Sequence, residues 1–193
     1  MIAARIGAGL LLAAGLGACA REAAEPVAPE PVPAAAPAAQ RQAPTLLPGV
    51  PLPANAPRVT PRETEALEIA TSGGPVRFQV ELADTEEERA QGLMWRGSMP
   101  ADRGMVFDYG DPIDLSPASG RGFWMRNTYI PLDIIFIGTD GRIQSIARNT
   151  QTLSDQPIHA AAGPVRLILE INAGLSEQLG ILPGDKVSHR LLP

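Results

Sequence analysis

A run of prolines in the first third of the chain restricts the fold more than any other feature. Eleven prolines fall between residues 26 and 61, and alanine fills much of the remainder. Proline has no backbone N–H to donate and favours extended polyproline II segments. With so few large apolar side chains, this stretch cannot bury enough surface to fold. We therefore predict a Pro/Ala-rich tether over residues 19–61 and a single β-rich domain over residues 62–193. A proline-rich ligand for a protein partner is the alternative role of the tether.

The first 18 residues have the pattern of an export signal. Arg5 supplies a positive charge, and residues 6–16 form an apolar run that is too short to span a bilayer. The motif LGAC at residues 16–19 resembles the bacterial lipobox, and Cys19 is the only cysteine of the chain. We predict a lipoprotein signal peptide over residues 1–18 and a lipidated Cys19 that anchors the chain to a membrane. An ordinary secretory signal with a chance cysteine is the alternative.

The predicted anchor also indicates a compartment. A lipidated export product lies on the periplasmic side of the cell envelope. Arg21, and not aspartate, stands at the second position after Cys19, so the outer membrane is the expected location.

The composition excludes several classes of function. The chain has 16 basic and 21 acidic residues, a net charge of −5, so we expect no nucleic-acid partner. A single cysteine excludes a disulfide framework, and two histidines exclude a three-histidine metal site. We expect no cofactor.

Apolar residues alternate with polar ones in short stretches of the 62–193 region, which is typical of half-buried strands. Asp140 and Gly141 suit the positive φ angles of a type I′ hairpin turn. Strands are predicted at residues 67–69, 76–82, 132–137, 142–146, 165–171 and 186–191.

Two short helices are predicted between the strands. Thr85 and Glu88 form a capping box, and Gly92 stands where that helix would end. Asn172 is expected to cap a second helix that ends near Gly180. The predicted fold is mainly β: a small antiparallel β-sandwich or barrel with two short helices, whose long loops 108–122 and 149–163 are candidates to carry function.

The most distinctive motif begins with FWMRNT at residues 123–128 and continues with Leu132, Asp133 and the Asp140–Gly141 pair. With RAQGLM at residues 89–94 and PGDKV at residues 183–187, it resembles the bacterial and archaeal family called domain of unknown function 192, over about residues 67–191. The resemblance implies a mainly-β domain that is often exported or tethered to a membrane, and it implies no activity. Arg126 stands where lysine is common in the family, which keeps the charge but disfavours a nucleophilic amine.

The same motif is the candidate ligand site. Trp124 offers an aromatic platform, and Arg126, Asn127 and Asp133 offer hydrogen-bonding groups within ten residues. This combination suits a small polar ligand such as a sugar, which stacks on the ring and pairs its hydroxyls with amide and carboxylate groups. Arg103 is a further candidate charge at this site.

A structural role is the alternative for each of these residues. Trp124 would then belong to the core, Asn127 and Thr128 would cap a turn, and Asp133 would pair with Arg126 inside the domain.

Two other classes of function remain open beside a non-catalytic envelope domain that binds a ligand or an envelope component. An enzyme acting on envelope glycans would need paired carboxylates, such as Asp133 with Glu170 or a loop acid. A soft-metal protein would bind Cu(I) through the thioethers of Met94, Met105 and Met125. Methionines that simply fill the core are the alternative to the metal site.

Overall fold

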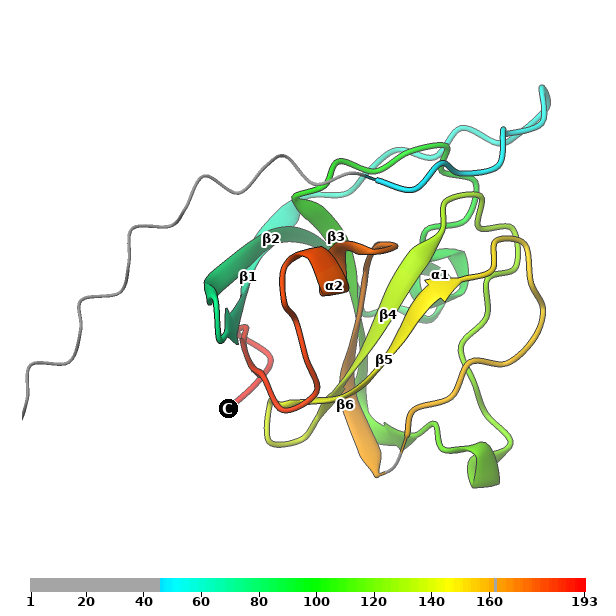
Figure 1. Ribbon diagram of the computed structural model, residues 1–193. Helices are drawn as coiled ribbons and strands as arrows, with labels where there is room; N and C mark the ends of the chain where they lie inside the picture. Colours follow the sequence, from blue (N-terminus) through cyan, green and yellow to red (C-terminus); the bar gives the residue numbers. More distant parts are fainter. Residues whose placement is uncertain (1–45, 162) are drawn as a thin grey trace, which may run out of the picture. The chain divides into compact units, whose positions relative to one another are not determined.

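Seven strands form one curled sheet in the computed structural model, which describes residues 46–161 and 163–193 (Figure 1). The predicted signal peptide, Cys19 and residues 20–45 of the tether lie outside the described residues. The elements in chain order are β1 (Thr64–Thr71), β2 (Gly74–Ala83), α1 (Glu86–Gln91), β3 (Arg103–Asp114), the 3-10 helix η1 (Pro117–Ser119), β4 (Leu132–Gly138), β5 (Ile143–Thr150), β6 (Pro164–Asn172), α2 (Leu175–Gln178) and β7 (Lys186–Ser188). In this part of the chain, no helix has the length and apolar character needed to cross a membrane.

The sheet curls until its two outer strands touch. Its strand order is β5-β4-β6-β3-β2-β1-β7, and all neighbours are antiparallel except β2 and β3. That pair is parallel because the long connection through α1 carries the chain back before β3 begins. The Ile143 N–H donates to the Asp185 carbonyl (3.0 Å) and the Val187 N–H to the Gly141 carbonyl (2.8 Å), which joins β5 to β7. The prediction of a small, mainly-β barrel or sandwich with two short helices is therefore confirmed.

Both faces of the central strands are buried. On β6, Leu167, Leu169 and Ile171 point into one apolar cluster, whereas Ile168 packs in a second cluster on the other face. The sequence pattern predicts β6 as half-buried, but Glu170 on the second face is buried as well. The second face is covered because the two long loops pack over it.

The loop between β3 and β4 is hydrogen-bonded to the loop between β5 and β6. Phe123 and Ile158 exchange two backbone hydrogen bonds (2.8 and 2.6 Å), and the Leu153 N–H donates to the Thr128 carbonyl (3.1 Å). The first loop begins later than predicted, because β3 continues to Asp114 through a register shift between residues 108 and 113, and it extends as far as residue 131. The loops thus form a layer over the second face of the sheet.

The first helix agrees with the sequence prediction. The Thr85 hydroxyl accepts from the Glu88 N–H, and the Glu88 carboxylate accepts from the Thr85 N–H, each at 3.2 Å. Gly92 ends α1 with a φ of 46°, a conformation that favours glycine.

The predicted cap of the second helix is wrong. Gly174, with a φ of 81°, precedes α2 in place of Asn172 and has no side chain with which to cap the helix. The Asn172 amide instead donates to the carbonyls of Met99 (2.9 Å) and Pro100 (3.2 Å), 73 and 72 residues away in the chain.

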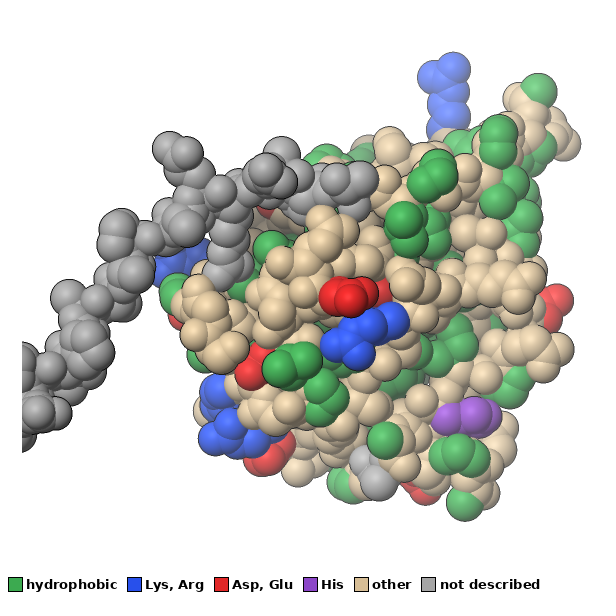
Figure 2. Space-filling view, in the orientation of Figure 1, with side chains coloured by type: hydrophobic (Ala, Val, Ile, Leu, Met, Phe, Trp, Pro, Cys, Tyr) green, Lys and Arg blue, Asp and Glu red, His purple; other side chains and the backbone are tan. Residues whose placement is uncertain are grey.

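The last part of the predicted tether lies against the sheet domain. The Val50 N–H donates to the Tyr129 carbonyl at 2.7 Å, and a Cβ on Gly49 would lie 2.6 Å from that same oxygen. Figure 2 shows apolar side chains gathered where this segment runs, and the exposed ones include Leu46, Leu47 and Val50. Residues 49 and 50 therefore contact a domain that was predicted to begin at residue 62.

Candidate functional site

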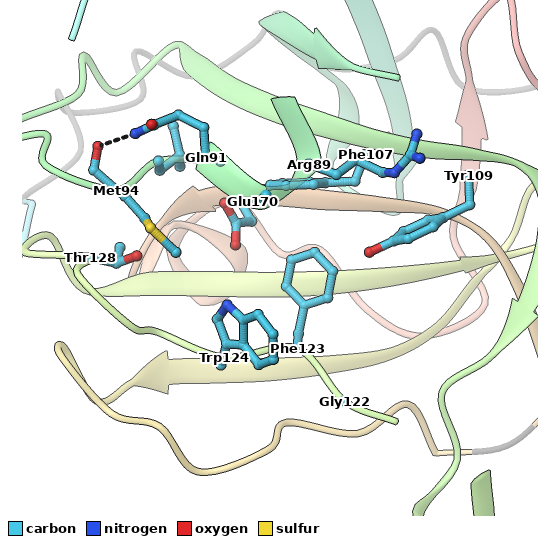
Figure 3. A pocket seen from close by; sticks show the side chains of 13 residues that line it. Arg89, Gln91, Met94, Phe107, Tyr109, Gly122, Phe123, Trp124, Thr128 and Glu170 are labelled. Atoms are coloured by element: carbon cyan, nitrogen blue, oxygen red, sulfur yellow. Dashed lines mark hydrogen bonds between the residues drawn. The ribbon is translucent and has the colours of Figure 1, made fainter. Parts of the chain in front are cut away.

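A pocket of about 490 Å³ opens between α1, β3, β6 and the loop that contains residues 122–128 (Figure 3). Half of the chain's eight aromatic residues line it. These four residues are Phe107, Tyr109, Phe123 and Trp124. The remaining wall includes side chains of α1 and, on the sheet side, Glu170.

The aromatic rings differ in burial. Phe107 and Phe123 pack edge to face with centroids 4.9 Å apart, and Phe107 is fully buried. Trp124 is 49% exposed and carries the Arg126 guanidinium 5.2 Å above its ring. In Figure 3 its indole nitrogen points to the side of the pocket where Met94 and Glu170 lie. Trp124 is therefore available to a ligand, whereas Phe107 and Phe123 form the wall.

Glu170 places a buried carboxyl group at this pocket. Its side chain comes from β6, is 4% exposed, and extends toward the space above Phe123 and Trp124 (Figure 3). Its Oε2 atom has no hydrogen-bond partner among the described residues. Burial raises the pKa of Glu170 to about 8, although the charge of Arg96 opposes this shift. The group is therefore protonated and neutral at pH 7.

Arg89 forms the charged edge of the pocket. Its Nη1 donates to the carbonyl of Asp108 at 2.8 Å and to that of Asp84, and its guanidinium lies 4.8 Å from the centroid of the Tyr109 ring. Desolvation by burial raises the pKa of Tyr109, so its hydroxyl is neutral at pH 7. In Figure 3 this hydroxyl points toward Phe123.

The structure brings only part of the predicted site to the pocket. Trp124 lines it, and Arg126 lies beside Trp124 with its Nε 2.6 Å from the Asp155 carboxylate. Asn127 has a φ of 52° and donates to the sulfur of Met94 at 3.8 Å. Arg126 and Asn127 thus contact Trp124 and Met94, which line the pocket, but do not line it themselves.

Asp133 and Arg103 lie elsewhere. Asp133 is fully buried, and its two oxygens accept from the backbone N–H groups of Asn149 (2.9 Å) and Ser176 (3.0 Å). Arg103 donates to the Thr64 hydroxyl at 3.0 Å. Neither residue lines the pocket, which corrects the prediction that both contact the same ligand as Trp124. Asp133 instead joins β4 to β5 and α2, and Arg103 joins β3 to β1.

The predicted carboxylate pair of Asp133 and Glu170 is also wrong. In the β4–β6 register, Asp133 stands opposite Ile171 and Glu170 stands opposite Ile134. Because successive side chains of a strand point to opposite faces, the two carboxyl groups project from opposite faces of the sheet. They cannot act on the same glycosidic bond.

The three methionine sulfurs of the soft-metal hypothesis do not line the pocket together. Met105 and Met125 are fully buried in the second apolar cluster, and only Met94 lines the pocket. The Met125 sulfur accepts from the Thr150 hydroxyl at 3.2 Å. Among the described residues, no group of three or more His, Cys, Asp and Glu side chains could hold a metal ion.

A second, wider groove lies between the segment that precedes β1 and residues 95–103. The buried ion pair between Arg96 and Glu81 borders it, with contacts of 2.5 and 2.7 Å. Burial alone would raise the pKa of Glu81, but hydrogen bonds from Arg96 and from the Arg62 backbone hold it below its ordinary value. Because these charged groups are already paired, we place the candidate site in the pocket of Trp124 and Glu170.

The position of Glu170 in this pocket was not predicted from the sequence. Its alternation with Leu169 and Ile171 is typical of a residue on a solvated strand face. A signal was present in the run LILEI at residues 167–171, where large apolar residues occupy both faces. Such a run is typical of a strand that is buried on both sides, and it predicts a buried carboxyl group.

Comparisons with known proteins agree with this fold. The family model DUF192, described as uncharacterized ACR, matches residues 68–189. A solved protein from Sinorhizobium meliloti 1021, named provisionally as a transcription regulator, has 37% identity and a TM-score of 0.62, over 70% of this chain and 100% of its own. A protein of unknown function from Novosphingobium aromaticivorans DSM 12444 has 42% identity and a TM-score of 0.59, over 70% of this chain and 94% of its own. None of the curated proteins matches this chain.

Proposed function

Since the chain belongs to the DUF192 family, which is described as uncharacterized, we propose its function from the pocket itself: a non-catalytic domain that binds a small polar ligand against Trp124. The observation that carries this proposal is the half-exposed indole beside a buried carboxyl group whose Oε2 has no hydrogen-bond partner in the described part of the chain. A ring with polar substituents, such as a sugar, would stack on Trp124 and hydrogen-bond to Glu170.

We prefer binding to catalysis because the polar groups nearby already have partners. Arg89 is bonded to two backbone carbonyls, and Asp108 contacts Arg166. Glycoside hydrolysis requires two carboxyl groups that flank the same bond. Asp133 projects from the opposite face of the sheet and cannot be the second group beside Glu170. Transcription regulation, the provisional role of the Sinorhizobium protein, is not adopted, because a net charge of −5 opposes binding to DNA phosphates.

We further propose that the domain is a lipoprotein of the cell envelope. The support is the motif LGAC at residues 16–19, with the chain's only cysteine at Cys19. The lipid would hold the domain on the periplasmic side, with the outer membrane as the expected location. A Cys19→Ser variant should move from the membrane fraction to the soluble fraction of the cell, and a variant that stays with the membrane contradicts the anchor.

The binding proposal is tested by the thermal stability of the full-length chain in detergent with sugars and muropeptides. A ligand at 100 times its Kd adds about 2.7 kcal/mol to the free energy of unfolding. We expect this gain to disappear in Trp124→Ala and to persist in Leu182→Ala, which truncates another exposed apolar residue. A ligand whose effect is the same in Trp124→Ala and in the unmodified chain contradicts this site.

A further inference from the structure

The pocket contains a carboxyl group whose own surroundings do not satisfy it. Glu170 is almost fully buried, its Oε2 has no hydrogen-bond partner among the described residues, and the group extends into the pocket. A buried polar atom without a partner is unfavourable unless a bound group completes its hydrogen bonds. The arrangement therefore indicates a ligand group that reaches Glu170.

The rings around this carboxyl group favour a positive charge. Phe123 and Trp124 lie on one side of it in Figure 3, and Phe107 and Tyr109 complete the wall. The face of an aromatic ring is electron-rich and attracts a cation within about 6 Å of its centroid. A cation is therefore the ligand group that is attracted both by the aromatic ring faces and by an ionised Glu170.

The charged and titratable groups that face Glu170 do not neutralise its carboxylate, so a cationic ligand group can pair with it. Arg96 is paired with Glu81, Arg89 is bonded to backbone carbonyls over the Tyr109 ring, and Tyr109 carries a neutral hydroxyl. The facing residue on β4 is the apolar Ile134. Arg89 would repel a cation at the Tyr109 end, whereas the Arg126 guanidinium beside Trp124 is already paired with the Asp155 carboxylate. The cation therefore belongs at the Trp124 end of the pocket.

We propose that the ligand carries a protonated amine, which lies among the aromatic rings and donates its N–H groups to the carboxylate of Glu170. This inference rests on the proposed binding function, and it names the ligand class. The proton balance is simple: Glu170 releases its proton to solvent when the ammonium group enters, and the pocket then holds one negative and one positive charge. An amino sugar is one ligand of this class.

The proton release sets the pH dependence of binding. An ammonium ligand binds the ionised form of Glu170, so its affinity rises about tenfold from pH 6 to pH 7. A neutral ligand that accepts a hydrogen bond from the protonated carboxyl group has the opposite dependence and loses affinity above pH 8. The sign of the slope therefore separates the two ligand classes.

The test uses two matched pairs of probes on the full-length chain in detergent: glucosamine with glucose, and benzylamine with benzyl alcohol. Intrinsic fluorescence, to which Trp95 and Trp124 both contribute, reports affinity, and titration calorimetry in two buffers reports proton release. We expect at least one amine to bind about tenfold or more tightly than its alcohol at pH 7, with close to one proton released. Glu170→Gln should lose this preference, and Glu63→Gln, the same change at an exposed residue, should keep it.

Three results would overturn the inference: alcohols that bind as tightly as their amines in both pairs, a preference that survives in Glu170→Gln, or amines that do not bind. If glucose binds and Trp124→Ala abolishes that binding, the proposed function stands and only the amine is wrong. If no probe responds to Trp124→Ala, both proposals fail. Should Glu170→Gln not fold, proton release by the unmodified chain decides the question.

Discussion

Glu170 is the residue whose surroundings differ most from those of an ordinary surface glutamate. Burial raises its pKa from 4.5 to about 8, so between these pH values the folded chain holds a proton that the unfolded chain has released. The contribution of this group to stability is fully present below about pH 4.5 and is lost as the pH rises through 8. The carboxyl group of Glu170 therefore lowers the free energy of unfolding at neutral pH. We expect such a cost of a residue whose role is to bind a ligand.

The pH dependence gives a direct prediction for Glu170→Gln. Because glutamine does not titrate, the variant should gain stability over the unmodified chain by about 1.4 kcal/mol for each pH unit between pH 5 and 8, and no more above pH 8. Urea unfolding from pH 5 to pH 9 measures this difference, with Glu63→Gln as the control. A difference that does not change with pH would show that Glu170 ionises normally.

Asp133, in contrast, serves the fold. Its carboxylate accepts the N–H groups of Asn149 and Ser176, and a hydrogen bond to a charged group contributes about 1.5–3 kcal/mol. Asp133→Asn keeps one acceptor oxygen but turns an NH₂ group toward an N–H donor. We expect a loss of about 2–3 kcal/mol in the free energy of unfolding, measured in urea.

The control for this substitution is Asp111→Asn, which makes the same change at an exposed residue. Its stability should stay within about 0.5 kcal/mol of the unmodified chain. A loss in Asp133→Asn no larger than that of the control would show that the buried hydrogen bonds contribute little.

At the level of the element, α1 depends on its cap. The helix spans only Glu86–Gln91, has no buried residue, and brings Arg89 to the pocket. The Thr85 and Glu88 side chains satisfy backbone N–H groups at its first turn. Removal of the hydroxyl in Thr85→Ala should cost about 1 kcal/mol in the free energy of unfolding.

Urea unfolding measures this cost against Thr139→Ala, an exposed threonine in the β4–β5 turn. If Thr85→Ala and Thr139→Ala lose the same free energy of unfolding, the hydrogen bond of the Thr85 cap does not stabilise the domain. Because α1 also supplies Ala90 and Gln91 to the pocket wall, we also expect weaker ligand binding in Thr85→Ala.

At the level of the whole molecule, the sheet closes through contacts between its outer strands, and the preceding segment adds to it. The Val50–Tyr129 hydrogen bond lies outside a fragment that begins at residue 62. We expect the fragment 46–193 to be more stable than the fragment 62–193 by about 1 kcal/mol, the contribution of one such bond. Urea unfolding of the two fragments measures this difference, and equal midpoints would return the domain boundary to residue 62.

The features that the sequence alone determined are local. The capping box of α1 joins residues three apart, and the strand from residue 76 to residue 82 follows from the alternation of neighbouring side chains. The FWMRNT motif also identified Trp124 as a candidate, because a dense group of unusual residues is visible without a structure. Each of these signals lies within a few residues of the chain.

Only the tertiary structure decided the surroundings of Asp133 and Glu170. The Asp133 partner Ser176 is 43 residues away, and the Asn172 amide bonds a carbonyl 73 residues away. Glu170 became buried because the loop that contains residues 122–128 folds over β6. A periodic pattern reports which face of a strand a side chain occupies, but what covers that face depends on segments far away in the sequence. For this reason the sequence determined the fold class and identified one residue of the pocket wall, Trp124, whereas the structure determined the pocket.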